Sequence, residues 1–396
     1  MTDTDPPTPR RGRWGRRLAR AGLGLAIVML VVVAWPPSRV TLQTVALIPS
    51  ILQMGPQPLA LAPEPTHRVV LYTAPDGERL PADLWLPATA SAERPVGAVV
   101  FVSGINSKGR AHPALAQLAE AMSRAGAAAY IPELPRFFHD QVDASEVGRI
   151  VAAFEDLAAR PEIDRDRIGI MGVSVGGSLS LIAAADPAIA DQLAWVGAFG
   201  AYADAGDLAT MVLSRQYELD GEVVSWEPRL LVRQVSFRLV IDQVPDEADR
   251  DALRAAYKAY NDEGIHPFPV VEVELRTEAG RAAQAIVATD SLAESQAAVA
   301  AAPEGMRDVL DGISPLSHLD EIHARVYLMH DTGDHHIPFV ASRQMAAVLA
   351  EAGVDVRLGE FRLFDHVQPD TTDLGVALPE LWKLFWYLRD VAAETL

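Results

Sequence analysis

The chain has no cysteine and only three lysines, Lys108, Lys258 and Lys383, among its 396 residues. The absence of cysteine excludes disulfides, thiolate metal sites and lipid attachment through sulfur, and it leaves the redox compartment of the protein open. Positive charge is scarce as a whole, because 34 lysines and arginines face 53 aspartates and glutamates, which gives a net charge of −19. Such an acidic protein repels phosphate backbones, so we expect no nucleic-acid partner.

The overall composition is that of a globular protein. Hydrophobic residues make up 49% of the chain and charged residues 22%, which provides apolar material for a sizeable core. The length allows one large α/β domain with an insertion, or two domains. We find no internal repeat.

The N-terminus has the pattern of a membrane-targeting segment. Residues 1–20 contain six arginines and two aspartates, and an uncharged apolar run follows over residues 21–35. As a helix, this run would extend about 22 Å, which is short for a hydrocarbon core of about 30 Å. The pattern therefore leaves two interpretations open, a cleaved secretory signal and an uncleaved anchor.

The end of the apolar run favours the anchor. Bulky side chains continue up to Trp35, and the two prolines that follow would make a poor start for a mature chain. We therefore predict a transmembrane anchor over residues 21–36, with residues 1–20 in the cytoplasm and the remainder outside, as the positive-inside rule requires. Cleavage would instead make the protein secreted.

Residues 37–66 are predicted as a linker. Scattered apolar residues open this stretch, and residues 56–65 are rich in proline, which disfavours regular structure. We expect the segment to connect the anchor to the folded domain, with its apolar residues against the membrane surface or the domain.

From residue 67 onward, apolar runs typical of strands alternate with amphipathic helical patterns. Eight strands are predicted, at residues 68–73, 80–86, 97–102, 127–131, 168–171, 194–199, 326–329 and 356–363. The first two form a hairpin, whereas continuous apolar runs such as residues 97–102 are typical of buried parallel strands. The predicted fold class is α/β, with a mostly parallel eight-stranded sheet and helices on both faces.

A long insertion interrupts the alternation. Residues 204–319 contain helical patterns without a further strand of the sheet, and such an insertion is usually a subdomain. We therefore predict a core of residues 67–203 and 320–396 with a helical cap of residues 204–319. The cap should lie over the carboxyl ends of the strands, where sites in open α/β sheets are found. It carries no motif that reveals a substrate.

The most informative motif is Gly172-x-Ser174-x-Gly176, which lies between a predicted strand and a predicted helix. Glycines on either side leave room for a serine on a tight, strained strand-to-helix turn, so that its hydroxyl stands clear of the sheet. The pattern occurs by chance in unrelated proteins, but the strand and helix around it predict that Ser174 is a nucleophile.

Together, the strand order and this motif resemble the α/β-hydrolase fold, over residues 67–203 and 314–390. The stretch from His330 to Pro338 is similar to the family's pattern for the catalytic acid, which implies that Asp334 is the acid. His366, after the final strand, fits the family's histidine, and the chain order serine, acid, histidine is the one the family requires. Residues 161–169 look like the lead-in of dienelactone-hydrolase and prolyl-oligopeptidase-type members.

The resemblance implies a role for each residue. His366 would take the proton of the Ser174 hydroxyl, and Asp334 would orient the imidazole and stabilise its charged form. The backbone N–H groups of Val175 and Ile105 would hold the oxyanion. Neither a metal nor a cofactor is needed for this chemistry, so we expect none.

Departures from the family pattern occur at three positions. Ser103 replaces a frequent histidine, and Asp331 and Asp365 replace frequent glycines. None of these residues belongs to the triad. We expect the Asp365 carboxylate to face water.

Two alternatives for the site remain open. Asp204 and Asp207 follow an earlier strand and could supply the acid in place of Asp334. The second alternative is a metal site of the metallo-β-lactamase type, because the sequence from His330 through Asp334 to His335 and His336 differs from that motif by one residue. The missing middle histidine and the late position in the chain disfavour it. Trp382 and Trp386, four residues apart on the last predicted helix, are expected to serve packing.

The sequence thus predicts a serine hydrolase that cleaves a small-molecule carboxylic ester, thioester or lactone through an acyl-enzyme on Ser174. Serine at the turn disfavours the dehalogenase and epoxide-hydrolase reactions, which use aspartate in this fold. The alternative is a catalytically inactive member that serves as a binding or scaffold protein of the cell envelope, which the complete triad disfavours. The substrate and the oligomeric state are not predicted.

Overall fold

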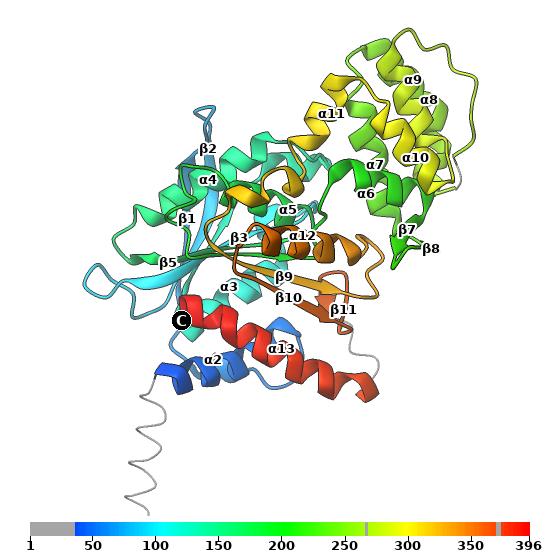
Figure 1. The fold of residues 1–396 in the computed structure, drawn as a ribbon. Coiled ribbons are helices and arrows are strands. Elements are labelled where there is room, and N and C mark those ends of the chain that lie inside the picture. Colours follow the sequence, from blue (N-terminus) through cyan, green and yellow to red (C-terminus); the bar gives the residue numbers. More distant parts are fainter. Residues whose placement is uncertain (1–35, 266–267, 370–373) are drawn as a thin grey trace, which may run out of the picture.

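The computed structural model describes residues 36–265, 268–369 and 374–396, and its centre is an eight-stranded sheet (Figure 1). The strands lie in the order β1-β2-β4-β3-β5-β6-β9-β10. Their bounds are β1 Thr66–Thr73, β2 Arg79–Leu86, β3 Val96–Val102, β4 Ala128–Pro132, β5 Ile163–Val173, β6 Trp195–Phe199, β9 Arg325–Asp331 and β10 Val356–Phe361. Each of the eight predicted strands is present, so the predicted α/β sheet is confirmed.

Only one edge of the sheet is antiparallel. β1 pairs with β2, and β2 with β4, in antiparallel register, whereas the pairs from β4 through β10 are all parallel. The central parallel strands β3, β6 and β9 are buried on both faces, which explains why their sequences are continuous apolar runs. Their carboxyl ends meet at one edge of the sheet, and this edge carries the site described below.

Two layers of helices cover the sheet. One face packs against α4 (Ser145–Ala158), α5 (Val175–Ala184) and α12 (Val340–Glu351). The other face packs against α2 (Pro36–Ile51), α3 (Pro113–Ala125) and α13 (Leu374–Thr395). The two faces use alternate residues of the same strands, because successive side chains of a strand point to opposite sides.

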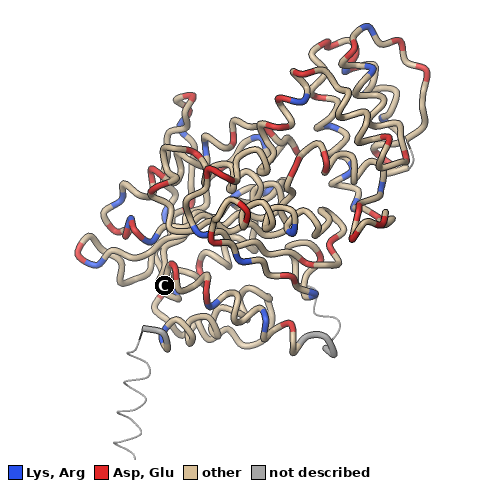
Figure 2. The backbone as a smooth tube through the Cα atoms, in the orientation of Figure 1, with Lys and Arg blue, Asp and Glu red and all other residues tan. Residues whose placement is uncertain are grey.

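Residues 37–66, predicted as a linker, are not an extended connection. Most of α2 lies in this range, beside α3 and α13, and the short 3-10 helix η1 (Pro58–Leu61) follows it. Leu47, Leu52 and Leu59 are buried. Arg39 is the one charged residue of α2, and the tube of this helix is mostly tan in Figure 2. The scattered apolar residues of this segment thus complete one layer of the fold.

The predicted membrane anchor, residues 21–36, lies outside the described residues except for Pro36. Over the described ranges, no helix combines the length and the apolar character needed to cross a bilayer.

In its described residues, the predicted cap range, residues 204–319, holds six α-helices and one small hairpin. They are α6 (Ala205–Ser214), α7 (Leu230–Asp242), α8 (Glu247–Glu263), α9 (Glu278–Val287), α10 (Leu292–Ala300), α11 (Glu304–Asp311) and the strands β7 (Gln216–Leu219) and β8 (Glu222–Ser225). Several of these helices share a hydrophobic cluster of their own, which includes Phe237, Tyr257 and Ile286. Figure 1 shows α8, α9 and α10 standing away from the sheet.

Candidate active site

Ser174 lies on a sharp turn between β5 and α5. Its backbone has φ 55° and ψ −133°, a conformation that L-residues rarely adopt, and it is the N-cap residue of α5. The Ser174 N–H donates a hydrogen bond of 2.7 Å to the carbonyl of Phe199 at the end of β6. The turn therefore holds the serine at the carboxyl edge of the sheet, at the positive end of a helix dipole.

The glycines around Ser174 are required by close backbone contacts. A Cβ on Gly172 would come within 2.4 Å of the Gly176 carbonyl oxygen, and a Cβ on Gly176 within 2.1 Å of the Ser103 carbonyl oxygen. A Cβ on Gly104 would meet the Ser174 Cβ at 2.9 Å. The G-x-S-x-G pattern is thus a packing requirement, and the turn after β3 lies directly beside the serine.

His366 lies at the tip of a short hairpin that follows β10. The short strands β11 (Phe364–Asp365) and β12 (Gln368–Pro369) pair with each other and leave His366 and Val367 as the two-residue turn. His366 has φ 61°, in a position that usually requires glycine. The ring is almost fully buried and lies beside Gly200, where an added Cβ would be 2.9 Å from it. Because Gly200 follows Phe199, this contact places the imidazole next to the strand end that holds Ser174.

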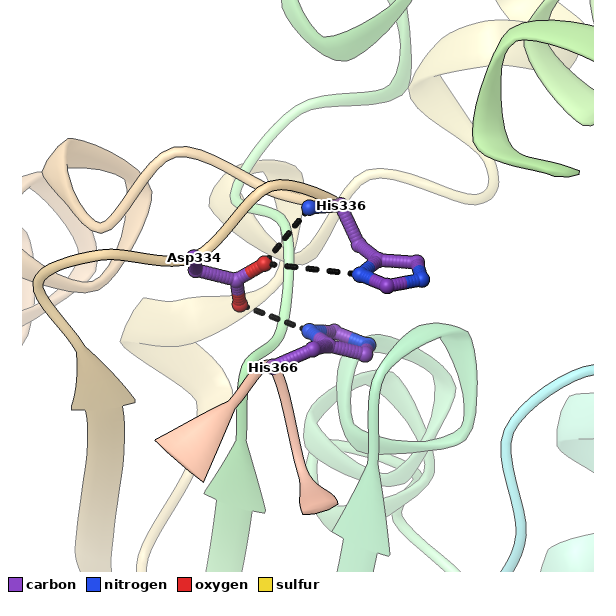
Figure 3. A group of neighbouring side chains, drawn as sticks. All are labelled: Asp334, His336 and His366. Atoms are coloured by element: carbon purple, nitrogen blue, oxygen red, sulfur yellow. Dashed lines mark hydrogen bonds and ion pairs between the residues drawn. The ribbon is translucent and has the colours of Figure 1, made fainter. Parts of the chain in front are cut away.

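Asp334 binds the ring of His366 (Figure 3). Asp334 Oδ2 accepts a hydrogen bond of 2.6 Å from His366 Nδ1, and Oδ1 accepts from the N–H groups of His336 and Ile337 at 2.6 and 3.1 Å. A carboxylate can only accept, so His366 Nδ1 carries the proton and Nε2 is left as the basic nitrogen. Burial opposes ionisation of Asp334, but His366 and His330 hold its pKa far below the usual range.

His330 supports the acid from the end of β9. It is fully buried, and its Nε2 lies 3.0 Å from the Ile337 carbonyl and 3.2 Å from Asp334 Oδ2. Its Nδ1 is 2.7 Å from the hydroxyl of Ser342. With both nitrogens engaged, His330 fixes the loop that presents Asp334.

His336 is a site residue whose position the sequence analysis did not predict. Its ring stacks on that of His366, with centroids 4.5 Å apart and planes 20° from parallel (Figure 3). Burial and the neighbouring His366 lower the pKa of His336 to about 4. His336 is therefore neutral near pH 7 and forms an uncharged wall against the imidazole of His366.

Asp331 binds the start of the β11–β12 hairpin that carries His366. Its Oδ2 accepts from the N–H groups of Leu363 and Phe364 at 2.8 and 2.9 Å, and its Oδ1 from Gly333 at 2.8 Å. Burial raises the pKa of Asp331, against the effect of these three N–H donors. A glycine at this position could not make these bonds, so Asp331 is a positioning residue for the His366 hairpin.

Asp365 is partly exposed to water, as expected from the sequence, and it also forms an ion pair. Its Oδ2 accepts from Arg229 Nη2 at 2.6 Å, and the Arg229 N–H also donates to the His335 carbonyl at 2.8 Å. Arg229 is the N-cap residue of α7. One residue of the cap range is thus tied to both the acid loop and the histidine hairpin.

The predicted oxyanion donors lie beside Ser174. Val175 begins α5, and Ile105 belongs to the turn after β3 that contacts Ser174 through Gly104. Asn106 braces this turn, because its amide donates to the Gly104 carbonyl at 2.9 Å. Within the described part of the chain, neither the Val175 N–H nor the Ile105 N–H donates a hydrogen bond. Both are therefore free to bind an oxyanion.

These parts line one cavity of about 400 Å³. Ser174, Ile105, His336 and His366 contribute to its wall at the carboxyl edge of the sheet. Apolar residues of the cap range, namely Leu208 of α6 and Leu231, Val232, Val235 and Leu239 of α7, also line it. The structure thus brings Ser174 and His366 to the wall of a single apolar pocket, and it binds Asp334 to the Nδ1 side of His366, outside the residues that line the pocket.

The alternative acids lie elsewhere. Asp204 caps α6, with its Oδ1 accepting from the Asp207 N–H at 2.8 Å. Burial, followed by the charge of Asp204, raises the pKa of Asp207 to about 6. Among the described residues, the hydrogen-bonded carboxylate partner of His366 is Asp334.

A metal site is the other alternative from the sequence. Asp334, His336 and His366 could each offer one ligand atom, and these atoms lie within 4.8 Å of one another. The arrangement fits a metal poorly, because Asp334 already accepts hydrogen bonds on both oxygens and His366 Nδ1 is bound to it. His335, part of the predicted motif, lies outside this group, with Nδ1 3.2 Å from the Glu227 carbonyl.

Trp382 and Trp386 do not serve packing in the way expected. Their side chains are exposed on α13 and contact each other and Phe385.

No family profile matches the sequence, and no curated protein resembles it in sequence. Solved structures do resemble it in fold. Porphyromonas gingivalis dipeptidyl peptidase 4 matches 84% of this chain with 36% of its own, at 11% identity and a TM-score of 0.50. The chain has the α/β-hydrolase fold. Pyrococcus horikoshii acylaminoacyl peptidase matches 78% of this chain with 38% of its own, at 16% identity and a TM-score of 0.47. The 2,6-dihydroxy-pseudo-oxynicotine hydrolase matches 83% of this chain with 68% of its own, at 18% identity and a TM-score of 0.43.

This chain spans less than two fifths of the length of the two peptidases. At these identities the likeness is one of fold, and it confirms the resemblance inferred from the sequence. Within the α/β-hydrolase fold, Ser174 follows β5, Asp334 follows β9 and His366 follows β10, at the carboxyl edge of one sheet.

Proposed function

We propose that the protein is a serine hydrolase that cleaves a carboxylic ester, thioester or lactone through an acyl-enzyme on Ser174. The observation that carries this proposal is the buried bond of 2.6 Å between His366 Nδ1 and Asp334 Oδ2, because His366 lines the same cavity as Ser174. It leaves His366 Nε2 as a base on the side of the ring away from the acid.

The proposed reaction has two halves. Nε2 of His366 takes the Ser174 proton while Oγ attacks the acyl carbon, and the protonated imidazole then gives this proton to the departing alcohol or thiol. Water, activated by the same nitrogen, next attacks the acyl-enzyme and releases the acid. The N–H groups of Val175 and Ile105 hold the oxyanion in both halves, and each such donor contributes about two to three powers of ten in rate.

Labelling with a fluorescent fluorophosphonate tests this function. We expect the folded wild type to be labelled and the Ser174→Ala variant not to be. Ser178→Ala is the control, because Ser178 lies one turn further along α5 but is fully buried and bonded to the Tyr202 carbonyl at 2.9 Å. An unlabelled wild type would favour the inactive scaffold, and undiminished labelling of Ser174→Ala would discard the proposed nucleophile.

The metal alternative has its own test. A serine hydrolase of this design keeps its esterase activity after exhaustive dialysis against a chelator. Loss of activity with chelator, and recovery with added Zn²⁺, would favour a metal at Asp334, His336 and His366.

We also propose that residues 21–36 anchor the protein in a membrane, with the catalytic domain extracytoplasmic. The support is the arginine-rich segment before the apolar run. Fusion of reporter enzymes after Pro65 tests this topology. We expect activity from a reporter that works only outside the cytoplasm. Activity from a reporter that works only in the cytoplasm would contradict the proposal.

A further inference from the structure

The cavity at Ser174 does not end at the carboxyl edge of the sheet. It continues along one face, where its floor consists of side chains from four parallel strands: Val99, Phe101, Met171, Trp195, Tyr327 and Met329. The strand register places them on a common face, since Phe101 pairs with Met171 and Trp195 pairs with Gly169, two residues before Met171. The cavity is therefore a channel between the sheet and a layer of helices.

The far end of the channel lies at the opposite edge of the sheet. Trp195 is the first residue of β6, and its Nε1 donates a bond of 2.8 Å to Thr395 Oγ1 at the end of α13. Both residues line the cavity. The carbonyl of Phe199, which accepts the Ser174 N–H, marks the near end of the channel on β6. Trp195 lies four residues earlier on the same strand, a separation of about 13 Å at roughly 3.3 Å per residue.

The roof of the channel comes from three helices. α2 contributes Leu47 and Ile51, α3 contributes Leu115, Leu118 and Met122, and α13 contributes Leu388, Val391 and Ala392. Although α2 also contributes Thr44 and Ser50, most of the roof is apolar, so a peptide in the channel would lose most of the hydrogen bonds of its amide groups to water. A hydrocarbon chain has no such groups and would gain from leaving water.

We propose that this channel binds the acyl chain of a long, linear carboxylic ester, with the acyl carbon at Ser174 and the methyl end near Trp195 and Thr395. The inference rests on the proposed function and gives it a substrate class. An extended polypeptide covers at most about 3.6 Å per residue, which is about 1.2 Å for each of its three backbone bonds. At the same length per bond, an extended acyl chain of about eleven carbons fills about 13 Å. Attack by Ser174 Oγ transfers this acyl group and releases the alcohol from the cap side.

A series of p-nitrophenyl esters with acyl chains of 2 to 16 carbons, assayed with the full chain, tests this length. We expect kcat/KM to rise by about two- to fourfold for each added methylene up to about 10 to 12 carbons, because burying one methylene is worth up to about fourfold in affinity. Beyond that length the rise should stop. A flat profile, or an optimum at two to four carbons, would overturn the inference.

Neighbouring alanines of α13 supply a matched pair of variants. Ala392 is buried and lines the channel, whereas Ala393 is exposed. Ala392→Phe should fill the far end and lower kcat/KM for the 12-carbon ester at least tenfold more than for the 4-carbon ester. Ala393→Phe should leave both esters unchanged. Equal effects on the two esters in Ala392→Phe would contradict the channel.

A second pair covers the case in which Ala392→Phe does not fold. Leu118 is half-buried and lines the channel from α3, and Gln117 beside it is exposed. Leu118→Trp should reproduce the loss for the long ester, and Gln117→Trp should not.

Binding of dodecanoate to Ser174→Ala, measured by calorimetry, separates the channel from the chemistry. Binding that Ala392→Phe weakens at least tenfold supports the channel even if no ester is hydrolysed, in which case only the proposed function fails. Hydrolysis of short esters without dodecanoate binding would overturn the channel and leave the proposed function in place.

Discussion

The two faces of the central sheet are built from alternate residues of the same strands, yet one face is solid and the other encloses a cavity. On the solid face, Val100, Ile170 and Val196 pack against α4, α5 and α12. On the other face, Phe101, Trp195 and Tyr327 meet α2, α3 and α13. Of these six residues, Phe101, Trp195 and Tyr327 line the channel, whereas Val100, Ile170 and Val196 do not.

Side-chain size accounts for the difference. On the solid face, strands β3, β5 and β6 carry alanine, valine and isoleucine, which let a helix lie close to the strands and fill the space between them. The second face carries large aromatic and methionine side chains, such as Phe101, Trp195, Tyr327 and Met329. The strands thus separate two tasks: one face stabilises the fold, and the other provides room beside Ser174.

The strongest test of this comparison uses two neighbours on β5. Ile170 is fully buried on the solid face, and Met171 is half-buried on the channel face. We expect Ile170→Ala to lower the free energy of unfolding by about 2 to 5 kcal/mol. Met171→Ala should lower it by only about 1 kcal/mol, because the methionine already borders a cavity and loses fewer contacts. Urea denaturation of both variants measures the difference, and equal losses would break the comparison.

His336 lies at the edge of the sheet where the channel opens, and its protonation should make the stability of the fold depend on pH. The pKa of His336 is about 4 in the folded chain against an ordinary 6.5, so the unfolded chain binds this proton more readily. The stabilisation from the neutral ring is therefore complete above pH 6.5 and is lost as the pH falls towards 4.

His336→Asn removes this dependence. Between pH 7 and pH 5, we expect the wild type to lose about 2 kcal/mol more of its free energy of unfolding than the variant does. Urea denaturation at the two pH values measures this. If both proteins lose the same amount, His336 is not held neutral by its surroundings.

The smallest expected effect comes from a glycine on the channel face. A Cβ on Gly197 would meet the Met171 sulfur at 2.5 Å, and this flexible side chain can move into the channel. Gly197→Ala should therefore change the free energy of unfolding by no more than about 1 kcal/mol, since alanine is also intrinsically better than glycine in a strand. Gly172→Ala, which points to the solid face and meets backbone atoms, is the matched control and should cost far more. Comparable losses in the two variants would show that the channel face is as tightly packed as the solid one.

The strands and the three proposed catalytic residues could be predicted from the sequence for a physical reason. Buried parallel strands are continuous apolar runs, and a serine between glycines is one of few ways to build a strained turn. Asp334 and His366 follow identifiable strands, so the topology alone brings them to the edge that holds Ser174.

Contacts between distant segments could not be predicted in the same way. The prolines of residues 37–66 indicated a linker, but the apolar residues of α2 find their partners on α13, more than 300 residues later. The stacking of His336 on His366 and the ion pair of Arg229 with Asp365 also depend on tertiary structure. Periodicity indicates which residues are apolar, but not where they leave space unfilled. The channel therefore had no sequence signature.

The claim on which this account depends is that His366 activates Ser174. The most direct measurement is the second-order rate of Ser174 labelling by a fluorophosphonate in the wild type and in His366→Ala, with the labelled residue located by mass spectrometry. We predict labelling at Ser174 and a rate at least about a thousandfold lower without the imidazole. A ratio near one, or a label on another residue, would contradict the account.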